Sequence, residues 1–257
     1  MCIRDSQITD FDRDLSGLSA LGEAIVPSKT LKSVDLSDCG IEVKGVTEVA
    51  KFISAGAVLT KVSVLSNPIS AAGADALIEV FNQNTNLRTL LGIEEGVTEL
   101  NLSEKNVDPG QAKILAAELQ ASRAVAAVKK VVLSQNKLFG ANQYGNHTVD
   151  ADQSGWAALC DALPGSPVEE LDVSDIGMGV TGVTSLTKAI SAGAVINSLA
   201  LGSNPIGDEA MIQLLDVLKD VSLTSFDISR TNCGVSTATK LAELLAEETK
   251  FKAVLAH

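Results

Sequence analysis

The sequence predicts an α/β fold, a right-handed horseshoe with a concave parallel sheet and convex helices. The first observation behind this prediction is an eleven-residue pattern, L-x-x-L-x-L-x-x-N-x-L, that returns along the chain. The second is that the spacing of apolar residues changes from two inside the pattern to about 3.6 after it, which indicates alternating strands and helices. Because a helix is thicker than a strand, a stack of such units must curve, with the strands on the inner side.

Seven copies of the pattern can be followed, and the units that they begin are numbered 1 to 7. The copies start at Leu31, Leu59, Val97, Val128, Val168, Ile196 and Leu223. Successive starts lie 28, 38, 31, 40, 28 and 27 residues apart, so the basic unit has about 28 residues and two units carry insertions. Hydrophobic residues make up 46% of the chain and aromatic residues 3%, so small aliphatic side chains must fill the layers.

The segment that follows each pattern is a predicted helix. In unit 1, Val46, Val49 and Ile53 share one helical face, and Leu241 and Leu244 do so in unit 7. Gly and Pro mark the joins between strand and helix, as in the Asn-Pro pairs that begin at residues 67 and 204. Each unit is therefore a short strand, a turn and a helix.

The asparagine of the pattern, present as Asn67, Asn136 and Asn204, has a predicted structural role. Its side-chain amide can bond to backbone groups that the turn between strand and helix leaves unpaired. We therefore expect these asparagines to join neighbouring units and to take no part in chemistry.

We predict that residues 1–257 form a single solenoid of about seven to nine units. Residues 1–27 are expected to be a degenerate or non-native start, because the opening MCIRDS fits no unit. Residues 139–155 are expected to be an inserted loop, and residues 251–257 an incomplete unit.

Two further features of organisation depart from a simple row of units. Residues 87–90 begin 28 residues after Leu59 and predict an additional strand whose helix has been lost. Residues 35–58 and 172–195 are identical at 15 of 24 positions at a constant offset of 137. A block of several units was therefore duplicated, and the two halves are expected to present related surfaces.

Over about residues 28–257 the chain resembles leucine-rich repeat proteins of the ribonuclease-inhibitor-like subclass, which have units of about 28 residues with outer helices. The resemblance implies protein–protein recognition, since members include inhibitors, immune receptors, cytoskeletal regulators and activators of small GTPases. We therefore expect a non-enzymatic scaffold that binds a protein partner. Two alternatives stay open: an activating regulator of a small GTPase, and a fragment of a larger receptor or cytoskeletal protein.

The charge of the chain disfavours several classes of partner. With 20 basic and 32 acidic residues the net charge is −12, whereas nucleic-acid binding depends on Lys and Arg that neutralise phosphates. An anionic membrane surface is disfavoured for the same reason, and no apolar stretch reaches the roughly 18 residues of a membrane span. Four scattered cysteines and the lack of a leader sequence favour a cytoplasmic protein with reduced thiols and no cofactor.

Exposed positions of the strands predict an acidic concave groove. Such a groove would attract a basic protein or peptide by long-range electrostatics. The simpler interpretation is that exposed positions of an acidic protein carry Asp and Glu whatever the function. The candidate contacts are Asp35, Asp38, Glu99, Glu104, Glu169, Glu170, Asp172, Asp175, Asp227 and Arg230.

The loop 139–155 is the second candidate contact surface, because specificity in repeat proteins often lies in insertions. It holds Tyr144 and His147, and Trp156 follows it directly. We expect these three side chains to contact the partner.

The same loop contains half of a calcium-binding pattern. Asp150, Asp152 and Ser154 precede a glycine, and Asp161 occupies the twelfth position, where such loops carry Glu. The alternative, which the missing Glu favours, is a helix N-terminus capped by Ser154. His147 and His257 are the two histidines, and no nucleotide-binding or zinc pattern occurs, so we expect neither catalysis nor a bound metal.

Overall fold

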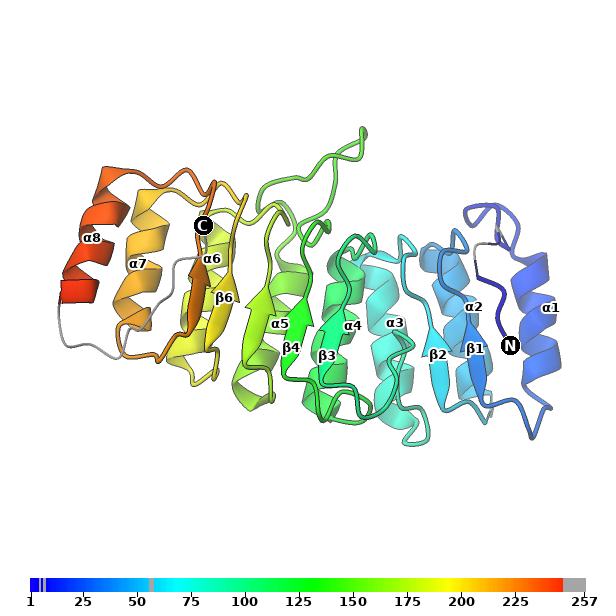
Figure 1. Cartoon of the computed structure of the whole chain (residues 1–257). Helices are drawn as coiled ribbons and strands as arrows, with labels where there is room; N and C mark the ends of the chain where they lie inside the picture. Colours follow the sequence, from blue (N-terminus) through cyan, green and yellow to red (C-terminus); the bar gives the residue numbers. More distant parts are fainter. Residues whose placement is uncertain (5, 7, 56–57, 247–257) are drawn as a thin grey trace.

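The computed structural model describes the chain except for residues 5, 7, 56–57 and 247–257. It forms one continuous row of strand–turn–helix units, with helices on one side and strands on the other (Figure 1). The strands are β1 Ser33–Asp35, β2 Lys61–Ser63, β3 Glu99–Asn101, β4 Lys130–Val132, β5 Glu170–Asp172, β6 Ser198–Ala200 and β7 Ser225–Asp227. The helices are α1 Ser16–Ile25, α2 Val43–Ser54, α3 Ser70–Gln83, α4 Pro109–Ala121, α5 Ser154–Ala162, α6 Val180–Ser191, α7 Asp208–Leu218 and α8 Val235–Ala246, with a 3₁₀ turn at Leu163–Gly165. The predicted α/β solenoid with a parallel sheet is confirmed.

The apolar positions of the pattern form the core. In unit 2, Leu59, Val62, Val64 and Ile69 are all fully buried between sheet and helices. The strands pair in parallel so that equivalent residues stand side by side, as Leu171 does with Leu199. Burying each such side chain stabilises the fold by about 1.5–3 kcal/mol.

The asparagines of the pattern connect units as predicted. The Oδ1 atom of Asn67 accepts hydrogen bonds from the amides of Cys39 and Ile41 in unit 1, at 2.9 and 3.0 Å. Its Nδ2 donates to the carbonyls of Leu36 and Val64, in units 1 and 2. Asn136 and Asn204 repeat this arrangement toward units 3 and 5. One asparagine thus serves two units, which explains why every second unit can lack it.

The residue seven places after the start of each unit adopts a left-handed backbone conformation. It lies in the turn that leads from the strand to the helix, beyond the three residues of the strand. These turns and the N-terminal ends of the helices form what we call the upper edge, at the top of Figure 1. The seven residues are Asp38, Ser66, Glu104, Gln135, Asp175, Ser203 and Arg230, with φ between 53 and 61° (53, 61, 57, 59, 53, 58 and 55°). Four of the candidate contacts therefore lie at the upper edge and not on the strand face.

The sheet is interrupted between units 2 and 3. It consists of a two-stranded part, β1–β2, and a five-stranded part, β3–β7. Thr89 and Leu91 form single bridges with β2, so residues 87–90 add a short edge to the first part but no full strand. From the convex side, Glu118 of α4 accepts hydrogen bonds from the amides of Leu90 and Leu91, at 2.6 and 3.0 Å. A buried carboxylate therefore takes the place that a neighbouring strand would occupy.

The first residues extend the sheet beyond β1. Cys2 forms a parallel bridge with Asp35, and the amide of Ile3 donates to the Asp35 carbonyl at 3.1 Å. Ile3 and Ile8 pack against the core, and α1 lies beside α2. The division into 1–27, 139–155 and 251–257 stays a prediction, and the last range lies outside the described residues.

Candidate functional site

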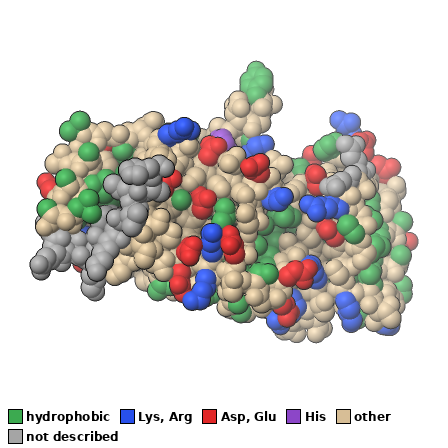
Figure 2. Space-filling view, in the orientation of Figure 1, with side chains coloured by type: hydrophobic (Ala, Val, Ile, Leu, Met, Phe, Trp, Pro, Cys, Tyr) green, Lys and Arg blue, Asp and Glu red, His purple; other side chains and the backbone are tan. Residues whose placement is uncertain are grey.

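Ion pairs neutralise the middle of the concave face. Glu99 pairs with Lys130 at 3.1 Å, and Glu169 with Lys129 at 2.7 Å. Through this contact the pKa of Lys129 is raised and that of Glu169 is lowered. Lys61 likewise pairs with Glu94, so positive and negative side chains alternate over the sheet (Figure 2). In this central region the predicted acidic groove carries paired charges, because lysines of adjacent units stand beside its glutamates.

Three aspartates at the end of their strands are held in one orientation. The Oδ1 atoms of Asp35, Asp172 and Asp227 each accept a hydrogen bond from the amide two residues further on, at 3.0, 3.0 and 2.8 Å. Burial alone would raise the pKa of Asp35, but the hydrogen bonds from Ser37 and the charge of Arg4 outweigh it and hold the pKa below its usual value. The three carboxyl groups are half-buried and fixed in orientation.

Asp172 and Asp227 stand apart from the ion pairs. Asp172 lies between Val132 and Ala200 in the register of the sheet, so no side chain at its level carries the opposite charge. Within the part of the chain that the structure describes, neither carboxylate forms an ion pair. Asp175 follows in the turn after β5, so unit 5 presents two acidic groups toward the upper edge. We call Asp172, Asp175 and Asp227 the acidic rim.

The inserted loop forms a hairpin that projects from the upper edge (Figure 1). Ala141 bridges His147 in antiparallel fashion, and the side chain of Asn142 accepts the amides of Tyr144 and Asn146 at 2.9 and 3.1 Å. The Tyr144 side chain is 78% exposed. At the base, His147 Nε2 lies 3.5 Å from Asp175 Oδ1. The hairpin and the acidic rim, which the sequence offers as separate contacts, are therefore adjacent.

Trp156 is not a contact residue, so the prediction that its side chain contacts the partner is wrong. Its indole is fully buried, donates from Nε1 to the Gly182 carbonyl at 2.8 Å, and lies 6.0 Å from the ring of Phe139. The residue follows the loop in sequence, but it belongs to α5, and its side chain points into the core. It anchors the base of the hairpin.

The carboxylates of the calcium-like pattern serve as helix caps. Asp150 accepts hydrogen bonds from the amides of Gly179, Thr181 and Gly182 at the start of α6, at 2.9, 2.7 and 3.1 Å. Asp152, and not Ser154, is the capping acceptor at α5, since Ser154 donates to it from its amide and hydroxyl.

Asp161 does not complete a calcium loop. It lies near the C-terminal end of α5, about 10 Å along the helix axis from the first residue. Among the described residues, no group of three or more His, Cys, Asp or Glu is placed to hold a metal ion. The calcium hypothesis therefore has no support from the geometry.

A signal for these caps is present in the sequence and was missed. Residues 12–17, DRDLSG, match residues 150–155, DADQSG, at an offset of 138. Asp12 caps the start of α2 through the amides of Glu42, Lys44 and Gly45, just as Asp150 caps α6. A pattern that occurs at the same place in both duplicated halves indicates a structural role.

The fold is a leucine-rich repeat solenoid, as shown by its regular units, its outer helices and the asparagines that connect neighbouring units. A family profile described as Leucine Rich repeat matches residues 28–50. Ribonuclease inhibitor from Sus scrofa is 26% identical over 223 residues, which cover 83% of this chain and 43% of the inhibitor. The chain has a leucine-rich repeat fold and is similar to the ribonuclease-inhibitor-like type. It spans less than half the length of that relative. No helix of the described residues is long and apolar enough to cross a membrane.

Proposed function

We propose that this protein is a non-enzymatic binding scaffold whose partner is a basic protein, held by the acidic rim and the hairpin together. The observation that carries the proposal is the contact of His147 with Asp175, which joins the exposed Tyr144 hairpin to the acidic rim. An exposed aromatic side chain in the hairpin, together with the carboxylates of Asp172 and Asp227, suits a basic surface, because it adds contact area to charge attraction. The neutral middle of the sheet supports a contact concentrated at the upper edge.

A ribonuclease is a candidate partner, since the relative from Sus scrofa is named for inhibiting one. The experiment measures binding of a pancreatic ribonuclease and of lysozyme, two basic proteins, at low ionic strength. Asp172→Asn with Asp227→Asn removes two charges and keeps the oxygens that accept the amides of Ser174 and Ser229. We expect the affinity of the partner to fall about tenfold, which corresponds to about 1.4 kcal/mol.

The matched control removes two carboxylates from the convex side. Asp75 and Asp216 pair with Lys113 and Lys240 there, so Asp75→Asn with Asp216→Asn changes the net charge equally. This variant should bind as the unmodified protein does. Equal losses for both double variants would mean that net charge alone attracts the partner, and the acidic rim would lose its assigned role.

The two alternative functions predict different results. An activating regulator would raise the rate of GTP hydrolysis by a small GTPase, whereas a binding scaffold leaves that rate unchanged. A fragment of a larger receptor or cytoskeletal protein would show further units in an extended reading frame.

A further inference from the structure

A pocket of about 530 Å³ lies at the upper edge, beside the base of the hairpin. Pro68 of unit 2, Pro109 of unit 3 and Ala141 of the hairpin supply its apolar lining. Asp108 and Asp152 supply its acidic side. The pocket therefore depends on the insertion 139–155, which departs from the repeat pattern.

The two carboxylates of the pocket are fixed but have capacity for further donors. Asp108 accepts the amides of Gln111 and Ser70 through separate oxygens, both at 2.8 Å. Asp152 accepts both of its bonds from Ser154 through Oδ1, at 2.9 and 2.5 Å. An ionised carboxylate offers about four lone-pair sites, so acceptor capacity remains on both groups.

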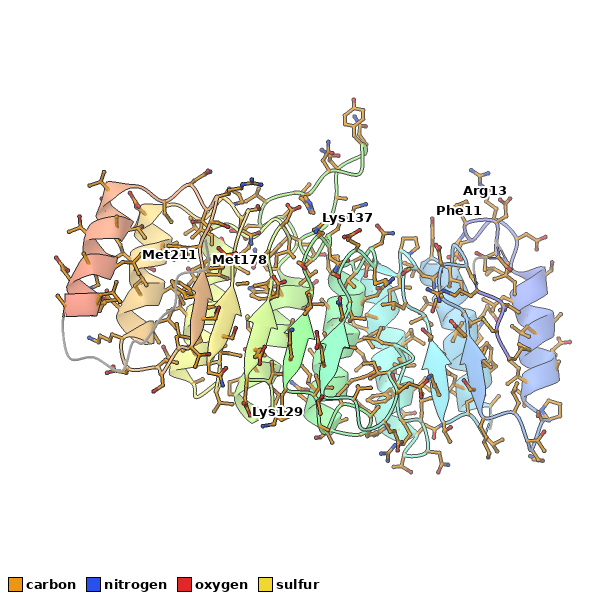
Figure 3. The ribbon with its side chains drawn as sticks, viewed as in Figure 1. Phe11, Arg13, Lys129, Lys137, Met178 and Met211 are labelled. Carbon is orange, nitrogen blue, oxygen red and sulfur yellow. The ribbon has the colours of Figure 1, made fainter. Side chains whose placement is uncertain are left out.

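The electrostatics of the pocket favour a cation. Burial raises the pKa of Asp108, and the negative charge of Asp152 adds to this effect. Lys137 also lines the pocket, but its Nζ lies 3.9 Å from the position that a Cβ on Gly145 would occupy, so it leans toward the hairpin. Figure 3 shows Lys137 at the upper edge, below the hairpin. The acidic side is thus left for a ligand.

We propose that this pocket binds an arginine side chain of the protein partner, a proposal that rests on the binding function given above. The aliphatic stem would pack against Pro68, Pro109 and Ala141, and the guanidinium would donate to Asp108 and Asp152. A planar guanidinium has five donors and is weakly hydrated, so it can serve two carboxylates that sit in a partly apolar site. An apolar side chain would instead cover the two charges without pairing them, which costs free energy.

The test uses N-acetyl-L-arginine amide as the probe and the matching citrulline compound as its uncharged analogue. NMR titration follows the backbone amide signals of Gly140 and Asp108, which line the pocket and are kept in every variant. We expect a saturable shift with the arginine compound, and binding of the citrulline compound weaker by about tenfold, the effect of about 1.4 kcal/mol. Ala141→Trp fills the pocket and should abolish the response.

Asp152→Asn provides the charge test with a matched control. The amide oxygen of Asn can still accept from Ser154, so the helix cap is kept while the charge is lost. Asp14 holds the equivalent place in residues 12–17 and accepts the amide of Ser16 at 2.9 Å, far along the chain from the pocket. We expect Asp152→Asn to weaken binding of the arginine compound several-fold and Asp14→Asn to leave it unchanged.

Three results would overturn the pocket assignment: equal binding of the two compounds, equal effects of the two Asn variants, or shifts confined to residues outside the pocket. The outcome is separable from that of the proposed function. If the small probe binds as expected while the acidic-rim variants still bind basic proteins normally, the arginine pocket stands and the acidic rim fails. If the acidic-rim variant loses affinity for the basic protein but the arginine compound does not bind, the partner is held by the acidic rim and the hairpin alone.

Discussion

Glu118 is the one fully buried charged side chain in the described part of the chain. Its Oε1 atom accepts from the amides of Leu90 and Leu91 and from the hydroxyl of Thr89, whereas its Oε2 atom is buried without a hydrogen-bond partner. Burial raises the pKa of this carboxyl from 4.5 to about 7. The residue closes the gap in the sheet but carries a cost when ionised.

Because the ionised carboxylate of Glu118 is unfavourable when buried, the free energy of unfolding depends on pH. Between pH 4.5 and about 7 the folded protein holds the proton of Glu118 while the unfolded chain has lost it. The free energy of unfolding therefore falls as pH rises through this window, by up to about 3 kcal/mol from this group, and its contribution is constant above pH 7. Glu118→Gln does not titrate, so urea unfolding at about pH 5 and pH 8 should show a smaller pH difference for the variant. An unchanged difference would show that Glu118 has an ordinary pKa.

At the scale of the element, aspartates of one unit fix the helix of the next. Asp12 and Asp150 reach α2 and α6 from equivalent places in the duplicated halves. Replacing either with Ala should lower the free energy of unfolding by about 1–2 kcal/mol, because three helix amides lose their acceptor. Asp161→Ala, at an exposed position near the end of α5, should change it by less than about 0.5 kcal/mol.

The same variants test the calcium hypothesis in thermal unfolding. A cap needs no ion, so adding calcium should leave the melting temperature of the unmodified protein unchanged. A rise of several degrees with calcium, lost in both Asp150→Ala and Asp161→Ala, would contradict the capping role.

The hairpin and its anchor should separate binding from folding. Replacing residues 141–147 with a short Gly-Ser linker leaves Phe139, Trp156 and the Asp150 cap in place, so circular dichroism should stay the same while partner binding falls. Trp156→Ala should instead lower the free energy of unfolding by about 3–5 kcal/mol, because it opens a cavity in the core. A folded, fully binding linker variant would show that the hairpin makes no contact.

Periodic burial explains which features could be predicted. Inward positions such as Val62, and the asparagine Asn67 that connects neighbouring units, repeat at fixed spacing, so their roles follow from the pattern itself. The Lys129–Glu169 pair also follows from the register of the units, because both residues stand one place after the start of adjacent units, but counting charges along each unit separately did not reveal it. Trp156 was misassigned because its position just after a polar loop does not reveal that its side chain faces inward. Comparison of residues 12–17 with 150–155 would have identified the caps from the sequence.

The whole molecule combines a repeated frame with local departures from it. The duplication supplies equivalent caps and core layers in both halves, whereas the hairpin, the acidic rim and the arginine pocket lie in the middle and the second half. Surface residues repeat as well: at the offset of 137, Asp38 corresponds to Asp175 and Ser66 to Ser203, so the expectation of related surfaces stays a prediction. Binding specificity is assigned to the residues that interrupt the pattern.

The most direct test of this assignment is hydrogen exchange of backbone amides in the presence of a basic protein that the binding experiment has identified as a partner. The proposed contact predicts slower exchange in residues 141–147 and in the turns after β5 and β7, with α2, α3 and α7 unchanged. Protection confined to the outer helices, with none in the hairpin or at the acidic rim, would contradict it.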